Sequence, residues 1–517
     1  MASFGWLQQK NIETTMDIFS GLIQGFSVAL TPLNLALCFL GCFLGTVVGV
    51  LPGLGPPATI AMLLPLTFKM DPTGAMIMLA GIYYGAKYGG STTAILLNVP
   101  GESASVATCL DGYQMARKGR AGAALGMSAI ASFIAGTFGV LALMLVAPPL
   151  AKLTLAFSAP EYFALMVLGL AMVVLLAGDS LTKALLAMLV GLWIASMGTD
   201  LFTATSRFTF GQTEMLGGIE FVIVAIGIFA VGEVMANMAP SRQVDMLPVP
   251  KGLKNLMPTW QDMKDCRFAF VNGSVVGFLI GVLPGAGSTI SSFLCYGIEK
   301  AVSKHPEKFG TGVIEGVAAP EGANNADTGG ALVPLLTLGI PGSGTTAILL
   351  AALVLWGFKP GPLFIQDSPA MFWGLVASMY IGNVVLLILN LPLVALFAQL
   401  LRMPGYVMYP LILGVSIVGV YASDSSIFHL GLLVVFGLVG YAMRKLDFPT
   451  APLVLGLVLG DAMEKSLRQA LMMSQGHISI LFRPIPAVLL LIAAFLLIVP
   501  LIKKFNSVRV QVIDQET

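Results

Sequence analysis

Of the six Pro-Gly pairs in the chain, four stand in matching order in its two halves, interrupt apolar stretches and are followed by residues that begin helices. These four pairs, here called the first to fourth breaks, are Pro52-Gly53, Pro100-Gly101, Pro284-Gly285 and Pro341-Gly342. Proline stops a preceding helix and glycine lets the backbone turn, so each break predicts a helix N-terminus within an apolar region. The unpaired N–H groups and the positive dipole end of such a terminus favour an anion. The chemistry indicated is anion binding.

The breaks occur in the same order in both halves of the chain. Gly49–Gly55 returns as Gly281–Gly287, identical at six of seven positions, and Asn98–Ser105 matches Gly339–Thr346. Matching broken helices in two repeats are the best sequence indication of a transporter site. The alternative is that the breaks are kinks that ease helix packing, or ordinary loops between spans.

Donors to a carboxylate are expected at and beside the breaks, as backbone N–H groups, hydroxyls, an amide and one ammonium group. The candidate substrate-binding residues are Pro52, Gly53, Gly55, Lys87, Asn98, Pro100, Gly101, Ser103, Ser105, Gly285, Ser288, Thr289, Pro341, Gly342, Ser343, Thr345 and Thr346. A cation inside an apolar segment is costly and must pair or face a cavity. Lys87 therefore meets either a substrate carboxylate or a structural partner, Glu102 or Asp327.

A second group of polar residues suits a hard cation, because unwound carbonyls and side-chain oxygens at helix breaks bind Na⁺ or H⁺ in transporters. The candidates are Glu102, Asn324, Asn325, Asp327 and Thr328. For Glu102 the favoured role is to cap a helix dipole, with cation binding second, and the alternative for the other four is a glycine-flanked loop turn. We expect Na⁺ as the coupling ion, with H⁺ as the alternative.

Neither a transition-metal site nor an organic cofactor is expected. The five cysteines form no C-x-x-C pair, and only three histidines are present. Zinc and iron sites normally draw on such residues.

The composition indicates what holds these residues in place. Of the 517 residues 57% are hydrophobic and 10% are charged, and the mean hydropathy is +0.90. Soluble domains carry about 25% charged residues, and a single soluble core cannot bury this apolar excess. The net charge of +1 offers no surface for nucleic acid. We therefore expect an all-α polytopic protein in a lipid bilayer.

Apolar segments long enough to cross a bilayer recur along the chain, and some are short or broken enough to be re-entrant. They lie near residues 18–50, 56–68, 73–98, 122–149, 160–178, 181–199, 216–238, 268–296, 329–357, 370–400, 405–422, 427–443, 449–463 and 485–503. We expect about twelve membrane-embedded helices in two structural repeats. The predicted organisation is an interfacial segment (1–17), repeat 1 (18–238), a central polar linker (239–267), repeat 2 (268–503) and a cytoplasmic tail (504–517).

Three basic clusters predict the topology. They are Arg117-Lys118 with Arg120, Arg444-Lys445, and Lys503-Lys504. Basic residues accumulate in cytoplasmic loops, so these clusters and the C-terminus are predicted to be cytoplasmic.

The chain resembles the large membrane subunit of the tripartite tricarboxylate transporters over nearly its whole length. The resemblance rests on Gly49–Gly55, Tyr83–Gly90, Asn98–Ser105, Gly281–Gly287, Glu315–Gly330 and Gly339–Thr346. It implies a bacterial inner-membrane importer of small carboxylates, driven by an ion gradient, with a small membrane subunit and a periplasmic solute-binding protein. By analogy with other carboxylate transporters, we expect inverted repeats and an elevator-like mechanism. The sequence leaves open whether the chain forms a homo-oligomer.

Other function classes fit less well. A self-sufficient sodium–carboxylate symporter and the large subunit of a TRAP-type transporter would share the helix breaks. A channel would conduct without gradient-coupled uptake. No Walker A, H-E-x-x-H or G-x-S-x-G motif indicates an enzyme, and Asp424 and Asp461 lack the Gly-x-Gly-Asp pattern expected of an intramembrane aspartyl protease.

Overall fold

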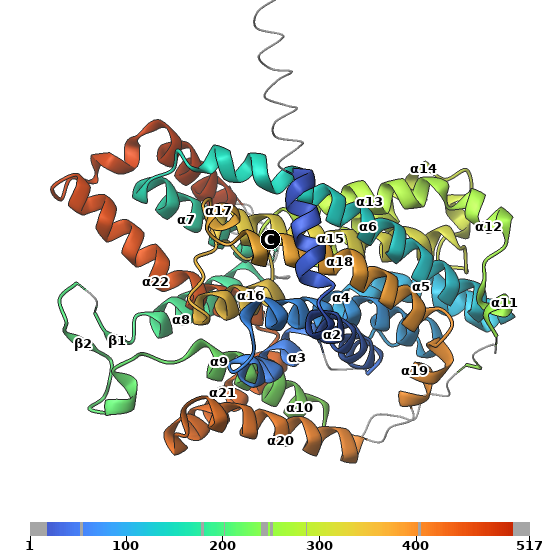
Figure 1. Cartoon of the computed structure of the whole chain (residues 1–517), viewed down its shortest axis with the longest axis horizontal. Helices are drawn as coiled ribbons and strands as arrows, with labels where there is room; N and C mark the ends of the chain where they lie inside the picture. The colour runs from blue at the N-terminus through green and yellow to red at the C-terminus, as the bar shows by residue number, and fades with distance from the viewer. Residues whose placement is uncertain are drawn as a thin grey trace, which may run out of the picture.

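The computed structural model describes residues 18–51, 55–176, 180–200, 202–238, 247–248, 252–285, 287–401 and 405–499. Within these ranges almost all regular structure is helical (Figure 1). The exception is a short antiparallel pair of strands, β1 (Gly198–Thr199) and β2 (Ser206–Arg207). The predicted helical architecture is confirmed apart from this hairpin. The predicted interfacial segment 1–17 and tail 504–517 lie outside the described residues.

The first half of the chain contributes the following elements. They are Ile18–Ala29, α2 (Pro32–Val50), α3 (Pro56–Leu63), η1 (Leu64–Thr67), α4 (Pro72–Leu97), η2 (Ser103–Ser105), α5 (Val106–Met115), the π-helical η3 (Ala116–Arg120), α6 (Ala121–Thr154), α7 (Ala159–Leu176), α8 (Leu181–Ala195), η4 (Thr213–Met215), α9 (Phe221–Ala225), the π-helical η5 (Ile226–Val231) and α10 (Gly232–Asn237).

The second half follows with a further series of helices. They are α11 (Leu253–Leu256), α12 (Trp260–Asp265), α13 (Arg267–Gly281), α14 (Gly287–Val302), η6 (Pro306–Lys308), α15 (Glu315–Leu338), α16 (Gly344–Leu355), α17 (Phe364–Asp367), α18 (Pro369–Asn390), α19 (Val394–Leu400), α20 (Gly405–Asp424), α21 (Ile427–Lys445), α22 (Thr450–Met473), η7 (Ile478–Phe482) and Pro484–Val499.

Several expected spans are divided in the structure, and proline accounts for the divisions. The span predicted at 18–50 is two helices, the second beginning at Pro32, and the span at 370–400 is α18 and α19, separated around Pro392. The spans at 268–296 and 329–357 each contain two helices that meet at the third and fourth breaks. Prolines lack the backbone donor that a continuous helix needs at these points.

By length and composition, four helices among the described residues can cross a membrane: Pro32–Val50, Ser103–Thr154, Pro369–Asn390 and Ile427–Lys445. Shorter apolar helices of 10–17 residues accompany them. An unbroken helix needs about 20 residues to cross a bilayer, so the shorter ones suit half-spans that meet at breaks.

The region predicted as a polar linker, 239–267, is partly helical. It contains α11 and α12, and α13 begins at its last residue, while residues 239–246 and 249–251 lie outside the described part. Arg120 donates to Asp262 of α12 at 2.6 Å, and Lys118 donates to the carbonyl of Thr311 at 2.5 Å. Burial alone would raise the pKa of Asp262, but hydrogen bonds from Arg120 and Thr259 hold this pKa below its ordinary value.

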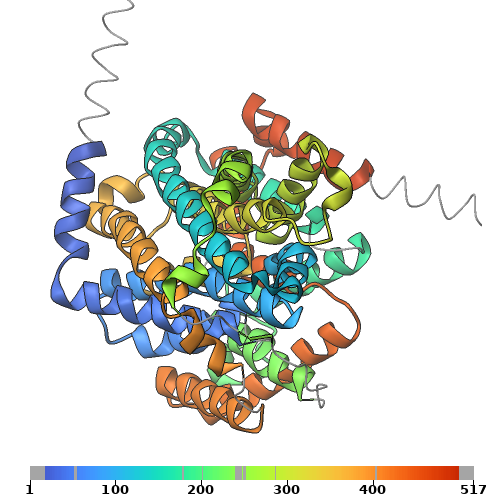
Figure 2. The ribbon, with the colours of Figure 1, turned by 90° about the vertical axis from the view of Figure 1, so that its right-hand side faces the viewer.

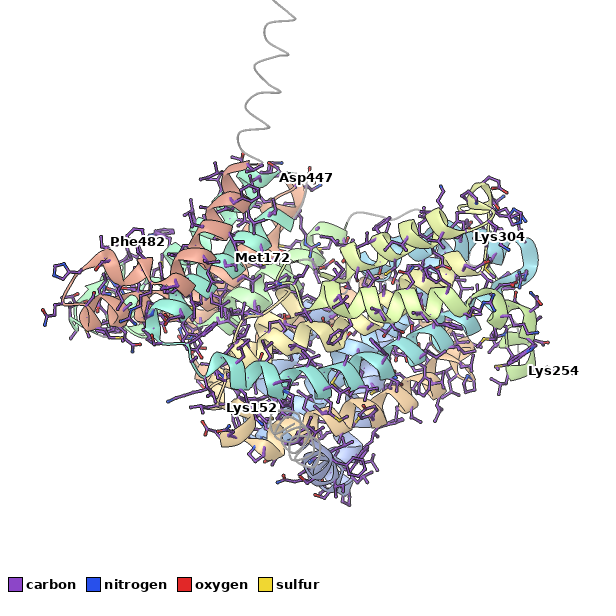
Figure 3. All side chains as sticks on the ribbon, turned by 90° about the horizontal axis from the view of Figure 1, so that it is seen from above. Lys152, Met172, Lys254, Lys304, Asp447 and Phe482 are labelled. Atoms are coloured by element: carbon purple, nitrogen blue, oxygen red, sulfur yellow. The ribbon has the colours of Figure 1, made fainter. Side chains whose placement is uncertain are left out.

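These contacts gather basic segments that are distant in the sequence. Figure 3 shows Lys254 and Lys304 at the same end of the molecule. The side of the membrane on which these residues lie stays a prediction.

Two long buried helices, α4 and α15, form the centre of the molecule. Gly74–Leu96 of α4 and Gly316–Thr337 of α15 are almost entirely inaccessible to solvent. Helix α2 packs along α4, and α13 packs along α15. Helices α6 and α18 lie side by side (Figure 2); α6 contacts both central helices, and α18 contacts α4. Each half of the chain thus supplies one central helix and the helix that packs along it.

Glycine permits the close approach of these helices. A methyl group on Gly49 of α2 would lie 2.1 Å from the carbonyl oxygen of Ala86 in α4. A methyl group on Gly281 of α13 would lie 2.5 Å from the carbonyl oxygen of Asp327 in α15. The two residues occupy matching positions in the repeated sequence, so the same contact holds the helix in front of the first and third breaks.

We predict that Gly49→Ala lowers the stability of the folded protein by about 1–3 kcal/mol, because the methyl group forces α2 and α4 apart. Thermal unfolding of the purified protein in detergent measures the change. Gly297→Ala is the matched control, since Gly297 lies in α14 with no neighbouring atom within 4 Å. An equal effect of the two substitutions would contradict the close-packing argument.

Candidate functional site

A cavity of about 440 Å³ lies where the helix breaks of the two halves meet, a size typical of small-molecule sites. Five helical segments begin at its wall: α3 at Pro56, η2 at Ser103, α14 at Gly287 and α16 at Gly344, which follow the four breaks, and α22 at Thr450. At η2, α14 and α16 the first N–H groups lack helical partners, whereas α3 begins with Pro56 and Pro57, which have no N–H. The aligned dipoles place partial positive charge at each start. The cavity is therefore electrostatically suited to an anion.

The second and fourth breaks have matching backbone geometry. Asn98 and Gly339, which end α4 and α15, both adopt the left-handed conformation, with φ of 56° and 69°. Glu102 and Ser343, which precede the next helical segments, are both extended, with φ of −138° and −157°. A left-handed residue closes a helix and redirects the chain. The same turn therefore carries each long central helix into a new helix start beside the cavity.

Hydrogen bonds join the breaks to one another. The Gly285 N–H of the third break donates to the Gly342 carbonyl of the fourth at 2.8 Å. The Thr289 hydroxyl donates to Ser103 Oγ at 3.0 Å, which links α14 to the second break. Polar backbone at membrane depth is thus paired within the protein, as a bilayer interior requires.

Ser343 has a structural role besides lining the cavity. Its hydroxyl accepts from the Thr346 N–H at 3.3 Å, and Thr346 Oγ1 accepts from the Ser343 N–H at 2.8 Å. This reciprocal pair is a capping box for α16. Thr346 is buried by it, whereas Ser343 and Thr345 line the cavity.

Lys87 is a buried cation at the floor of the cavity, with a relative exposure of 1%. Its ammonium donates to Asp327 Oδ2 at 3.0 Å and to the Asn324 carbonyl at 2.8 Å, and it lies 4.9 Å from the centre of the Tyr83 ring. Of the two structural partners considered from the sequence, the structure has Asp327. The ammonium carries three donors, and these two bonds use two of them.

The polar stretch Asn324–Thr328 is not a loop turn. It lies in the middle of the continuous helix α15. The flanking glycines allow close packing of neighbouring helices and do not form a turn. Asn324 donates to Glu102 Oε1 at 2.6 Å, while Asn325 turns towards α6 and donates to Ser132 Oγ at 2.7 Å. Asn325 is therefore separated from the other candidates by its orientation.

Several buried oxygens around this stretch have no hydrogen-bond partner within the described residues. They are Ser105 Oγ, Glu321 Oε2, Asn324 Oδ1, Asp327 Oδ1 and Thr328 Oγ1. Glu321, Asn324 and Thr328 follow one another at spacings of three and four, so they share one face of α15. An unsatisfied buried acceptor is costly, and several on one helix face suit a bound cation.

The structure gathers most of the predicted substrate-binding residues and separates others. Those that line the cavity are Gly55, Lys87, Pro100, Gly101, Ser103, Ser288, Thr289, Ser343 and Thr345, together with the ion candidate Glu102. Asn98, Ser105, Gly285, Pro341, Gly342 and Thr346 do not line it, and act through backbone turns, packing or capping. Pro52 and Gly53 lie outside the described residues.

Comparison with known proteins assigns the family. The family model described as "Tripartite tricarboxylate transporter TctA family" matches residues 35–455. The chain belongs to the TctA family. It is a component of a tripartite transporter and not an enzyme, and the family implies partnership with TctB and TctC subunits. It is accordingly a multi-pass membrane protein of a bacterial transporter family.

Two relatives from Agrobacterium vitis are similar in sequence. The chain is 47% identical to an "Uncharacterized 52.8 kDa protein in TAR-I ttuC' 3'region" over 505 residues, which cover 97% of this chain and all of the relative. It is 42% identical to an "Uncharacterized protein in TAR-II ttuC' 3'region" over 241 residues, 46% of this chain and all of that relative. No solved structure matches the chain.

Sequence reasoning missed several residues of the cavity in this TctA-family chain. Tyr83, Phe229, Glu233, Arg444 and Thr450 also line it. Glu233 pairs with Arg444 across α10 and α21. An acidic residue inside the predicted span 216–238 was a usable signal, because a buried carboxylate demands a partner. Arg444 was instead interpreted only as part of a cytoplasmic basic cluster.

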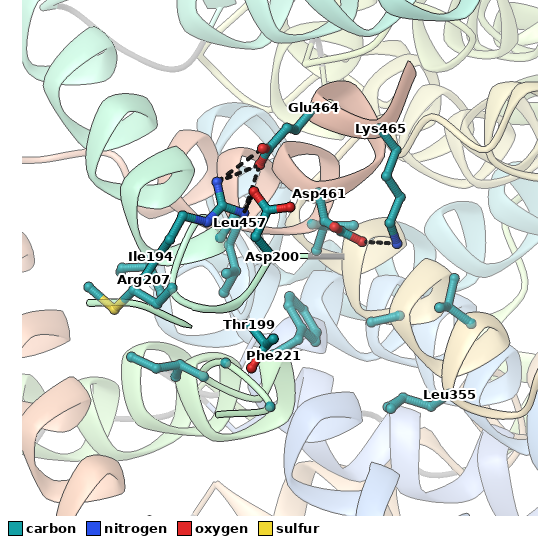
Figure 4. Close-up of a pocket in the computed structure, with 18 of the residues that line it drawn as sticks. Ile194, Thr199, Asp200, Arg207, Phe221, Leu355, Leu457, Asp461, Glu464 and Lys465 are labelled. Carbon is teal, nitrogen blue, oxygen red and sulfur yellow. Dashed lines mark hydrogen bonds and ion pairs between the residues drawn. The ribbon is translucent and has the colours of Figure 1, made fainter. Parts of the chain in front are cut away.

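A second cleft, of about 360 Å³, lies beneath the β1–β2 hairpin beside α8 and α22 (Figure 4). Arg207 pairs with Glu464 at 3.0 Å, and Lys465 pairs with Asp461 at 2.6 Å. Arg468 bridges Asp200 and Glu464 at 2.8 and 2.6 Å. Because these charges neutralise one another and none of the breaks within the described residues lines this cleft, the cavity at the breaks is the better candidate site.

We predict that Lys87→Met or Asp327→Asn alone destabilises the protein by about 3–5 kcal/mol, since each leaves an unpaired buried charge. The double substitution is expected to cost clearly less than the sum, as thermal unfolding in detergent would measure. The exposed pair Lys465–Asp461 serves as the control, and its single substitutions should cost about 0–1 kcal/mol. Additive effects at Lys87 and Asp327 would contradict their coupling.

Proposed function

We propose that the chain is the large transmembrane subunit of a binding-protein-dependent, ion-gradient-driven importer of small organic anions such as citrate or other tricarboxylates and dicarboxylates. The observation that carries this proposal is the convergence of Lys87 and the four helical starts that follow the breaks on one cavity. A carboxylate there would accept hydrogen bonds from N–H groups, hydroxyls and the third donor of Lys87. Each such charge-assisted bond is stronger than its neutral counterpart.

A coupling cation would bind next to this anion. We propose Na⁺, with H⁺ as the alternative, at the unpartnered oxygens of Asn324, Asp327 and Thr328 and near Glu102. Oxygen atoms are the ligands that hard cations prefer, and broken-helix transporters bind their coupling ions beside the substrate. A positive ion there would also offset the repulsion between an incoming carboxylate and the carboxylate of Glu102.

Two structural repeats would supply alternating access. The matching turns at Asn98 and Gly339, and the matching contacts of Gly49 and Gly281, support a repeated unit of helix, break and helix. Inverted repeats with an elevator-like motion remain our proposal for the mechanism. If the Arg444–Lys445 connection is cytoplasmic, as its charge predicts, the cavity extends to the cytoplasmic side in this conformation.

The two partner subunits would divide the remaining tasks. We propose a small membrane subunit and a periplasmic solute-binding protein that delivers the anion, in the inner membrane of a bacterium with the C-terminus in the cytoplasm. Of the alternatives from the sequence, the TctA family match argues against a TRAP-type large subunit, and a self-sufficient sodium–carboxylate symporter stays as the alternative. The requirement for partners distinguishes this alternative from the proposed function.

Uptake of labelled citrate into proteoliposomes tests the proposal. The vesicles contain this chain and its small membrane partner, with an inward Na⁺ gradient and with or without the purified binding protein. We expect uptake only when gradient and binding protein are both present. Uptake without the binding protein would favour the self-sufficient symporter, and no saturable uptake of any carboxylate tested would contradict the proposed function.

We predict that the double substitution Ser343→Ala and Thr345→Ala abolishes uptake in this assay while folded protein remains. Loss of the Ser343 cap alone should cost about 1 kcal/mol of stability. Ser180→Ala is the matched control, because Ser180 caps α8 in the same way but lies away from the cavity. Normal uptake by the double variant would remove the fourth break from the proposed site.

We also predict that Thr328→Val raises the Na⁺ concentration needed for half-maximal uptake, about tenfold, because it removes one of the proposed oxygen ligands without changing charge. The measurement is citrate uptake against external Na⁺. Thr337→Val, elsewhere on the same buried helix, is the control, since its hydroxyl bonds to the Val333 carbonyl within α15. An unchanged Na⁺ dependence in Thr328→Val would exclude this hydroxyl as a ligand.

A further inference from the structure

The cavity has a second cation, Arg444, on a wall built from helices other than those that start at the breaks. Arg444 lies at the end of α21 and pairs through Nη2 with Glu233 Oε2 of α10. The other carboxylate oxygen of Glu233 accepts from Asn237 at 3.4 Å. In the absence of substrate Glu233 therefore neutralises the guanidinium.

The guanidinium has N–H donors that its pairing with Glu233 does not use. It has five N–H groups, and its pairing with Glu233 runs through Nη2. Its Nε is buried and has no partner within the described residues. The side chain as a whole is 33% exposed, and it lines the cavity. A planar group with free donors matches a carboxylate, which accepts two parallel hydrogen bonds.

The local helix geometry connects this wall to the breaks. The π-helical turn η5 carries Phe229, whose ring would lie 3.2 Å from a methyl group on Gly344 at the start of α16. Glu233 follows four residues later, and both side chains line the cavity. π-helical turns inside α-helices are rare and frequently occur at functional sites. The π-helical turn presents an apolar ring to one helix start, and α10, which directly follows it, presents a carboxylate to Arg444.

From this geometry we infer that Arg444 is a specificity-determining residue that binds a second carboxylate of the substrate, and that Glu233 holds Arg444 in place when the cavity is empty. The helix starts and Lys87 bind one carboxylate, and Arg444 binds another carboxylate of the same molecule. The site therefore selects anions with at least two carboxylates. This inference rests on the proposed function and adds to it the residue that distinguishes polycarboxylates from monocarboxylates.

Binding measurements on the purified full-length protein test the inference. Labelled citrate is titrated into the wild type and into Arg444→Gln, Arg444→Lys and Glu233→Gln, with propionate and succinate as competitors. We expect Arg444→Gln to weaken citrate and succinate binding at least tenfold and to leave propionate competition unchanged. Arg444→Lys, which retains the charge but loses the planar donor pair, should weaken citrate binding less. Glu233→Gln should leave citrate binding unchanged or tighten it, because it frees the guanidinium.

Arg207→Gln provides the matched control. Arg207 is 31% exposed and pairs with Glu464 at 3.0 Å, but it lies in the other cleft. Melting temperatures establish that each variant is folded, and Arg444→Lys serves as the test if Arg444→Gln does not fold. Equal weakening by Arg444→Gln and Glu233→Gln, or an effect of Arg444→Gln no larger than that of Arg207→Gln, would mean that the pair only joins α10 to α21. Absence of citrate binding to the wild type would instead contradict the proposed function itself.

Discussion

Backbone polar groups inside a bilayer must find partners within the protein, and the second, third and fourth breaks satisfy this constraint together. Each unsatisfied group costs several kcal/mol in hydrocarbon, and no water is present to replace a lost helical partner. The Gly285–Gly342 hydrogen bond and the Ser103–Thr289 contact show how breaks from different parts of the chain complete one another. A helix start that keeps free N–H groups is then stable only beside a cavity that a polar ligand or water enters. The anion site is thus a consequence of how the broken helices are accommodated.

Both cations of this region are paired with carboxylates. Lys87 is matched by Asp327, and Arg444 by Glu233, while Glu102 accepts from the Asn324 amide. Such buried pairs contribute little net stability, because the desolvation of two charges offsets most of their attraction. They are better explained by function, since each cation keeps hydrogen-bond donors that an incoming anion can use. At the site where an anion is proposed to bind, Lys87 and Arg444 are therefore each paired with a carboxylate of the protein.

Much of this arrangement follows from the sequence, because the relevant signals are local. Proline and glycine at the breaks determine where helices end and begin, and the predicted N-termini at Ser103, Ser288 and Ser343 lie at the cavity. The nature of the Asn324–Thr328 stretch could not be deduced in the same way. Its glycines favour a turn in isolation, but α6, α13 and α14 pack so closely on α15 that the helix continues. Tertiary packing decides there, and a single sequence does not contain that contact information.

The role of Arg444 illustrates a second limit. In the sequence it stands next to Lys445 and beyond the end of an apolar span, where the ordinary interpretation is a cytoplasmic anchor. Only the fold shows that Glu233 of α10, 211 residues earlier in the chain, lies beside Arg444.

The proposed anion and cation sites also share Asp327, which pairs with Lys87 through one oxygen and leaves the other without a partner. A cation bound at that free oxygen would weaken the hold of Asp327 on Lys87, because the two positive charges then compete for one carboxylate. The ammonium would become more available to a substrate carboxylate, and a bound carboxylate would in turn stabilise the neighbouring cation. Coupling between the two ligands thus requires no long pathway, since a single buried ion pair connects both sites, and the coupling is reciprocal as linkage demands.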